Sequence, residues 1–227
     1  MTSTTRIPKA AITGAYGALA KRFSTKQFGT VADPLAVMWH NRPVLKAYFA
    51  IGGKAEKWGA CDAGLKSFAH LAVASLVGCS WCLDLGYFQA HNHELDLHKA
   101  REVPRWRESD VFTPLERDVL EYAEAMTRTP PTVTDELSAR LLKALGAPAM
   151  VELTAYVALA NLWTRSNTAF GIESQGFAAA CSLPPLAQPA PARPTSAQPA
   201  SAQPAAAQAP LAQPTGAQPS GAVPSAT

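Results

Sequence analysis

The chain has 227 residues, of which 16% are charged, and its formal net charge is +3. A positive charge that is so small and so thinly spread is not typical of nucleic-acid-binding proteins, so we expect no nucleic-acid partner. The longest apolar run, FAHLAVASLVGC, is much shorter than a bilayer span and contains a histidine, so no transmembrane segment is predicted.

The composition divides the chain into three parts. Residues 1–30 are interpreted as an N-terminal amphipathic extension, residues 31–183 as one helical domain, and residues 184–227 as a tail rich in Ala, Pro and Gln. The tail has no aromatic residue and only one charge, Arg193. Such a segment cannot bury enough apolar surface to offset its chain entropy, so we predict that it is disordered.

The first element predicted along the chain is a helix near the N-terminus. Ile12, Tyr16, Leu19 and Phe23 recur at helical spacing, which predicts an amphipathic helix packed on the domain or on a neighbouring subunit. The stretch also resembles a weak signal peptide, so attachment to a membrane surface and export are alternatives. We expect a cytoplasmic protein.

Helix signals continue through the domain, and strand signals do not appear. Two short helices begin at Pro34 and Pro43, and the central stretch 62–93 predicts two helices separated at Gly78. In FTPLERDVLEYAEAM, Thr113 and Glu116 have the spacing of a capping box. The next helix begins at Thr134 or Asp135 and ends at Gly146, and a longer buried helix then runs to about Gly171. The fold class is therefore all-α, a bundle of about eight helices.

The stretch VGCSWCLDLGYFQAHNH carries the strongest chemical signal. Cys79 and Cys82 are three residues apart, so on a helix they share a face and can form a disulfide. Gly78 places Cys79 near a helix N-terminus, where the helix dipole and unpaired amides favour a thiolate. We interpret the two cysteines as a redox pair, the alternative being two small core residues. His91 would lie about 13 Å further along the helix, too far to share a zinc ion, so no metal or cofactor is expected.

Several neighbouring residues are assigned structural roles. Cys61 and Cys181 are expected to be buried apolar residues rather than reactive thiols, and Trp81 is expected in the core. Asp84 is interpreted as solvated or structural, because a carboxylate beside the cysteines would disfavour a thiolate. The residues of HNHELDLHKAREVPRWRE predict a solvated basic loop, with a site for an anionic substrate or partner as the alternative: His91, His93, His98, Arg101, Arg105 and Arg107.

Two stretches together resemble a known family. LKSFAHLAVASLVGCSWCLDLGYFQA and LTAYVALANLWTRSNTAFGIESQGF are similar to the carboxymuconolactone decarboxylase-like superfamily, and within it to the alkyl hydroperoxide reductase D (AhpD-like) proteins, from about Ile7 to Cys181. The resemblance implies an all-α homo-oligomer that is either a disulfide-relay peroxidase or a lactone decarboxylase. In the peroxidase type, Cys82 would attack the peroxide and Cys79 would resolve the sulfenic acid into a disulfide.

The chain departs from the family pattern at two positions. The family has a glutamate twelve residues before the first cysteine and a histidine four residues after the second, and these form a proton relay; this chain has Ser67 and Gly86 there. His70 lies one helical turn from Ser67 and could replace the relay, because imidazole suits base chemistry near neutral pH. The alternative is a histidine that only packs in a helix interface.

These observations predict a thiol-dependent oxidoreductase that uses Cys82, Cys79 and His70. Its partners would be a small-molecule peroxide, or another small substrate, and a thiol or disulfide electron donor. One alternative is a decarboxylase acting on a small lactone or keto acid. The other is an oligomeric redox sensor or scaffold that has kept the fold and lost the relay.

Overall fold

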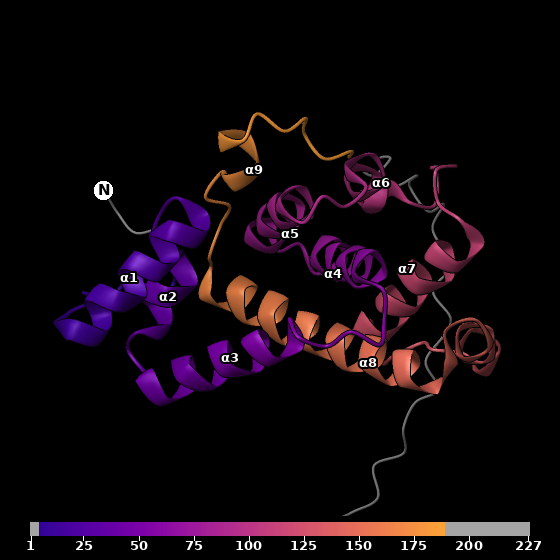
Figure 1. Ribbon diagram of the computed structural model, residues 1–227, viewed down its shortest axis with the longest axis horizontal. Helices are drawn as coiled ribbons and strands as arrows, with labels where there is room; N and C mark the ends of the chain where they lie inside the picture. The colour runs from indigo at the N-terminus through magenta and orange to yellow at the C-terminus, as the bar shows by residue number, and fades with distance from the viewer. Residues whose placement is uncertain (1–4, 189–227) are drawn as a thin grey trace, which may run out of the picture. The chain divides into compact units, whose positions relative to one another are not determined.

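Helices α4 and α8 form the centre of the fold (Figure 1). The computed structural model describes residues 5–188, and over them it contains helices and no strand, which confirms the all-α fold class. The helices are α1 (Gly14–Phe28), α2 (Asp33–Met38), α3 (Arg42–Ala55), α4 (Ala63–Val77), α5 (Ser80–Asn92), α6 (Leu97–Glu102), a 3-10 turn (Val103–Arg105), α7 (Pro114–Thr127), α8 (Asp135–Phe170) and α9 (Phe177–Ala180).

Helix α4 is buried because it packs against α5, α7 and α8. Its sequence is apolar on nearly every side, as expected of a helix surrounded by others, and Leu71 and Val73 are completely buried. Helix α7 contributes Val119 and Leu120 to the same core, and α8 contributes Leu153. This core fixes α4, which ends directly before Cys79, against α5, α7 and α8.

The predicted helix ends are largely confirmed. Thr113 and Glu116 form the capping box of α7, and Thr134 caps α8 by accepting a hydrogen bond from the Leu137 amide. Gly78 ends α4 with φ of 76°, a conformation that glycine adopts at little cost. Gly146, with φ of 77°, interrupts α8, so that the long helix consists of two helices joined at this residue.

Helix α8 is the one helix within residues 5–188 that is long and apolar enough to cross a membrane by length and composition. Central helices of globular domains pass the same test, and α8 packs against α4 and α7. It also carries Glu152, which forms a buried ion pair with Lys66 of α4. These contacts are those of a core helix.

The predicted N-terminal helix is present as α1, but its apolar residues do not face the chain's own core. Tyr16, Leu19 and Phe23 are 46%, 64% and 59% exposed. Instead, the small residues Gly17 and Ser24 are buried, and the Ser24 hydroxyl accepts a hydrogen bond from the Ala32 amide. Packing on a neighbouring subunit remains a prediction for the apolar face.

Two segments differ from the sequence-based expectation. The stretch predicted as a basic loop contains α6, because the Asp96 carboxylate caps the helix by accepting from the Lys99 amide. The short helix α9 was not predicted at all. The predicted disordered tail lies, from residue 189 on, outside the described residues.

Candidate active site

Cys79 and Cys82 are joined by a disulfide, with 5.3 Å between their Cα atoms. Cys79 is the N-cap residue of α5, and its Sγ accepts a hydrogen bond of 3.2 Å from the Cys82 amide. The left-handed turn at Gly78 places Cys79 there, directly after α4 ends. Each cysteine is only 1% exposed, so the sulfur atoms are inside the protein.

Residues near the end of α8 and after it cover the two sulfur atoms. Asn167 donates from Nδ2 to Cys82 Sγ at 3.5 Å, and this residue was not singled out from the sequence. Trp81 is buried, as predicted; its indole nitrogen donates to Gln175 and its ring packs edge-on against Phe177. Ile172 and Phe177 complete the apolar cluster around the disulfide.

Asp84 fastens this covering segment to α5. Its Oδ2 accepts hydrogen bonds from the Ser174 hydroxyl and from the amides of Gly176 and Phe177, at 2.7, 2.7 and 2.9 Å. Its Oδ1 accepts from the Ala178 amide at 2.8 Å. Asp84 is 8% exposed, so of the two predicted roles the structural one applies and the solvated one does not. We refer to residues 172–180, held by these bonds, as the C-terminal arm.

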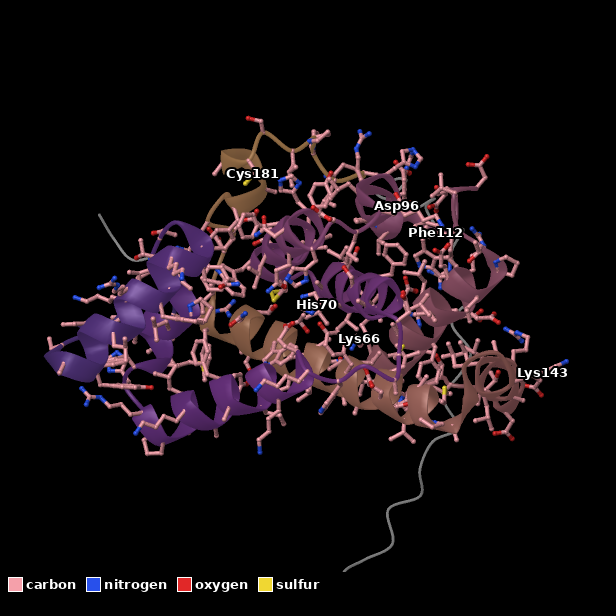
Figure 2. All side chains as sticks on the ribbon, in the orientation of Figure 1. Lys66, His70, Asp96, Phe112, Lys143 and Cys181 are labelled. Atoms are coloured by element: carbon pink, nitrogen blue, oxygen red, sulfur yellow. A yellow bond between two sulfur atoms is a disulfide. The ribbon has the colours of Figure 1, made fainter. Side chains whose placement is uncertain are left out.

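His70 lies on α4 beside the disulfide, which appears as a yellow bond in Figure 2. Burial lowers the pKa of His70 from 6.5 to about 4, and a hydrogen bond with the Cys82 backbone opposes this shift. Because the bond favours the protonated ring, the backbone group is the carbonyl, and His70 donates to it. Nε2 is buried and has no hydrogen-bond partner among residues 5–188.

Gly86 provides the space for this imidazole. A Cβ atom at position 86 would lie 3.1 Å from His70 Cδ2, 3.5 Å from His70 Nε2 and 3.0 Å from Leu71 Cδ2. A side chain at position 86 would therefore press against the His70 ring. Ser67, one turn earlier on α4, makes no side-chain hydrogen bond with another described residue. His70 and Gly86 are thus complementary in shape.

A cavity of about 440 Å³ lies beside His70. We call it the His70 cavity and define it by six of its lining residues: Trp58, Cys61, Lys66, Ser67, His70 and Tyr156. Lys66 is neutralised there, since its Nζ lies 2.6 Å from Glu152 Oε1 and 2.6 Å from the Trp58 carbonyl oxygen. Burial raises the pKa of the Cys61 thiol to about 11, so this cysteine is protonated at neutral pH.

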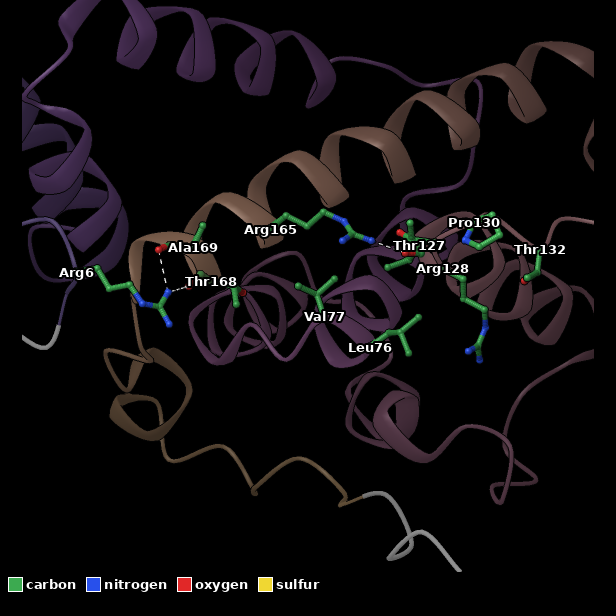
Figure 3. Close-up of a pocket in the computed structure, with 11 residues that line it drawn as sticks. Arg6, Leu76, Val77, Thr127, Arg128, Pro130, Thr132, Arg165, Thr168 and Ala169 are labelled. Atoms are coloured by element: carbon green, nitrogen blue, oxygen red, sulfur yellow. Dashed lines mark hydrogen bonds between the residues drawn. The ribbon is translucent and has the colours of Figure 1, made fainter. Parts of the chain in front are cut away.

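A second, more open groove of about 780 Å³ lies at the other end of α4 (Figure 3). Arg6 and Arg165 line it, and both donate to backbone carbonyls: Arg6 to Thr168 and Ala169, and Arg165 to Thr127. These arginines hold the N-terminal segment and the end of α7 against α8.

The other residues singled out from the sequence lie away from the disulfide or are structural. Cys61 is buried as predicted, but Cys181 is exposed, because it follows the short surface helix α9; that prediction was wrong. His91, His93 and His98 are exposed, and of the three only His93 lines the His70 cavity. The neighbouring arginines make structural contacts: Arg105 pairs with Glu102, Arg107 pairs with Glu124, and Arg101 donates to the Pro185 carbonyl.

Comparison with known proteins relates this site to one family. The sequence model of the carboxymuconolactone decarboxylase family matches residues 42–125, which include both cysteines and His70. Protein YnjA of Escherichia coli is 33% identical over 162 residues, which are 70% of this chain and 86% of YnjA.

Solved structures share the fold. An alkylhydroperoxidase AhpD core from Ralstonia eutropha, described as a peroxidase-related protein, superposes with a TM-score of 0.68 at 16% identity, covering 78% of this chain and 96% of that one. A cysteine variant of the debrominase Bmp8, in complex with 2,3,4-tribromopyrrole, superposes with a TM-score of 0.67 at 17% identity and the same coverage.

Proposed function

Because the chain belongs to the carboxymuconolactone decarboxylase family and has an AhpD-like fold, we propose that it is a thiol-dependent peroxidase using Cys79 and Cys82. The observation that carries this proposal is the buried disulfide at the N-terminus of α5, next to the buried imidazole of His70. The start of a helix stabilises a thiolate, which is the reactive form of cysteine.

In the reaction, the Cys82 thiolate attacks the outer oxygen of a hydroperoxide. The O–O bond breaks, the alcohol leaves with one proton, and Cys82 becomes a sulfenic acid. The Cys79 thiol then attacks this sulfur, which forms the disulfide and releases water. A dithiol electron donor returns two electrons and two protons by thiol–disulfide exchange, which regenerates both thiols.

We assign the proton transfer to His70. A neutral imidazole beside Cys82 can accept the thiol proton and later return it to the leaving alcohol. A thiolate on Cys82 would raise the pKa of His70 above its value in the disulfide form, because opposite charges stabilise each other. Asn167 would stabilise the Cys82 thiolate through its Nδ2–H group. These two side chains would replace the relay that Ser67 and Gly86 cannot form.

The decarboxylase alternative is less well supported. The substrate of a decarboxylase carries the carboxylate that it loses, and a carboxylate needs a cation in the site. In the His70 cavity, the ammonium of Lys66 is held by Glu152, and Glu56 and Asp62 add carboxylates to the lining. The sensor or scaffold alternative has the same fold and the same cysteines, but it does not reduce peroxide catalytically.

Peroxide treatment of the reduced protein tests the proposal. We expect one equivalent of cumene hydroperoxide to be consumed, with a loss of two protons in mass located to the peptide that contains both cysteines. Cys82→Ser should abolish this reaction, whereas Cys79→Ser should stop at a sulfenic acid that dimedone traps. His70→Gln should slow the first step, and His98→Gln, on the exposed surface, is the matched control. Unmodified thiols in the folded protein would refute the peroxidase and leave the scaffold.

A further inference from the structure

The open groove at the C-terminal end of α4 is positively charged. Its volume is about 780 Å³, it is lined by Arg6, Arg128 and Arg165, and among residues 5–188 no carboxylate lines it. We call it the arginine groove. Helices α4, α7 and α8 end beside it, and the partial negative charges of three helix C-termini sum to about −1.5. The charge of the three guanidinium groups exceeds this sum, so the groove attracts an anion.

The three guanidinium groups keep N–H donors that the described part of the chain does not use. Arg6 donates to two carbonyls of α8 from Nη1 alone, which leaves its Nε and Nη2. Arg165 donates from Nε and Nη2, which leaves its Nη1. Arg128 lies 3.9 Å from Glu124 Oε2, which is beyond hydrogen-bond distance, and that oxygen already pairs with Arg107 at 2.6 Å. Free guanidinium N–H groups bind carboxylates through charge-assisted hydrogen bonds.

The surface of the groove between these cations is apolar. Leu76 and Val77, the last two residues of α4, lie between Arg6 and Arg128 (Figure 3). Leu76 is 42% exposed, and Pro130 adds apolar surface to the same lining. An apolar chain that covers this surface removes it from water, which favours binding. The groove therefore combines an apolar strip with cations beside it.

We propose that the arginine groove binds a carboxylate attached to an apolar chain, which is the chemistry of a medium-chain fatty acid. Arg128 directly follows α7, and Arg165 donates to the carbonyl of Thr127, the last residue of α7, so both cations belong to the same end of the groove. The carboxylate binds at this end, and the chain covers Leu76 and Val77. The inference does not depend on the proposed function, because no described residue lines both this groove and the His70 cavity.

Three probes test the proposal on the full-length oxidised protein by isothermal titration calorimetry. Octanoate has the carboxylate and the chain, octan-1-ol has the chain with an uncharged head, and acetate has the carboxylate without the chain. We expect octanoate to bind at least about tenfold more tightly than octan-1-ol, because its hydrogen bonds with the arginines are charge-assisted. It should also bind at least about tenfold more tightly than acetate, because its chain is removed from water. In NMR, octanoate should shift the methyl resonances of Leu76 and Val77.

Variants then locate the site. Arg128→Gln should weaken octanoate binding about tenfold and leave octan-1-ol binding unchanged, and Arg22→Gln, exposed on α1, is the matched control. Leu76→Ser should weaken the binding of octanoate but not of acetate, with the exposed Leu142→Ser as its control.

Three results would each overturn the proposal: equal affinity for octanoate and either other probe, unshifted methyl resonances of Leu76 and Val77, or equal effects of Arg22→Gln and Arg128→Gln. The NMR measurement needs no variant, so the test holds even if a variant does not fold. Peroxide consumption is measured without these probes, so this inference and the proposed peroxidase can fail separately.

Discussion

Asp84→Asn is expected to release the C-terminal arm from the helix that carries both cysteines. The carboxylate accepts four hydrogen bonds from the arm, three at Oδ2 and one at Oδ1, and it is buried. An asparagine has one acceptor oxygen and one amide group. If the oxygen takes the place of Oδ2, the amide faces the Ala178 N–H, and two donors then point at each other.

The size of the effect follows from these four bonds. Bonds to a charged acceptor contribute about 1 kcal/mol more than bonds to a neutral one, which applies to the three bonds that remain. The Ala178 amide loses its partner inside the protein, which costs about 1–3 kcal/mol. Together, Asp84→Asn should lower the free energy of unfolding by about 4–6 kcal/mol, unless the arm detaches first and limits the loss.

Detachment of the arm should also expose the sulfur atoms. Ile172 and Phe177 cover Cys79 and Cys82, which are each 1% exposed. We therefore expect a water-soluble phosphine to reduce the disulfide of the variant at least about tenfold faster than that of the unaltered protein, since 1.4 kcal/mol already gives this factor.

Urea denaturation and phosphine kinetics measure the two effects, with Asp96→Asn as the control. Asp96 also caps a helix through its carboxylate, but it is exposed, and asparagine is as good a cap there. A loss below 1 kcal/mol for Asp84→Asn, together with a reduction rate equal to that of Asp96→Asn, would show that the arm does not protect the disulfide.

Three further predictions concern the His70 cavity. The free energy of unfolding should fall by about 3 kcal/mol as the pH is lowered from 6.5 to about 4. In this range His70 takes up a proton in the unfolded chain but not in the folded protein, where burial lowers its pKa. Denaturation of His70→Gln at the same pH values should lack this decrease. Gly86→Ala should slow peroxide consumption with little change in melting temperature, because its Cβ presses on the His70 ring while the helix gains about 1 kcal/mol. Gly53→Ala, in open space on α3, should leave the rate unchanged and raise the melting temperature. Lys66→Met should lower the free energy of unfolding, measured by urea denaturation, by about 3 kcal/mol, because Glu152 is left buried without its ion-pair partner. The double variant with Glu152→Leu should recover part of this loss. No recovery would mean that the ion pair is not the cause.

Much of the fold could be predicted because its helices begin and end at residues with specific chemistry. Thr113 with Glu116, Gly78, and Gly171 mark their helix boundaries through local hydrogen bonds and backbone conformation, which neighbouring residues determine. Such signals do not require knowledge of the rest of the chain. The position of Cys79 at the start of a helix followed from them.

The contacts around the disulfide could not be predicted in the same way. Asn167 and the C-terminal arm contact Cys82 and its neighbours on α5 across 85 to 94 positions of sequence, and no periodic pattern encodes such contacts. Helix α9 was missed because it has four residues and depends on Asp84 for its amide partners. Cys181 was wrongly placed in the core for the same reason: its exposure depends on where the arm runs.

Cys79 has a place in the architecture of α5 apart from any chemistry, since its sulfur caps the helix by accepting the Cys82 amide. Substitution of Cys79 by serine and by alanine should therefore affect the helix start differently. A serine oxygen can take over the cap, so Cys79→Ser removes the thiol and keeps the helix start, whereas Cys79→Ala removes both. The difference in stability between these two variants isolates the capping contribution of this sulfur, and their shared loss of turnover isolates its chemical one.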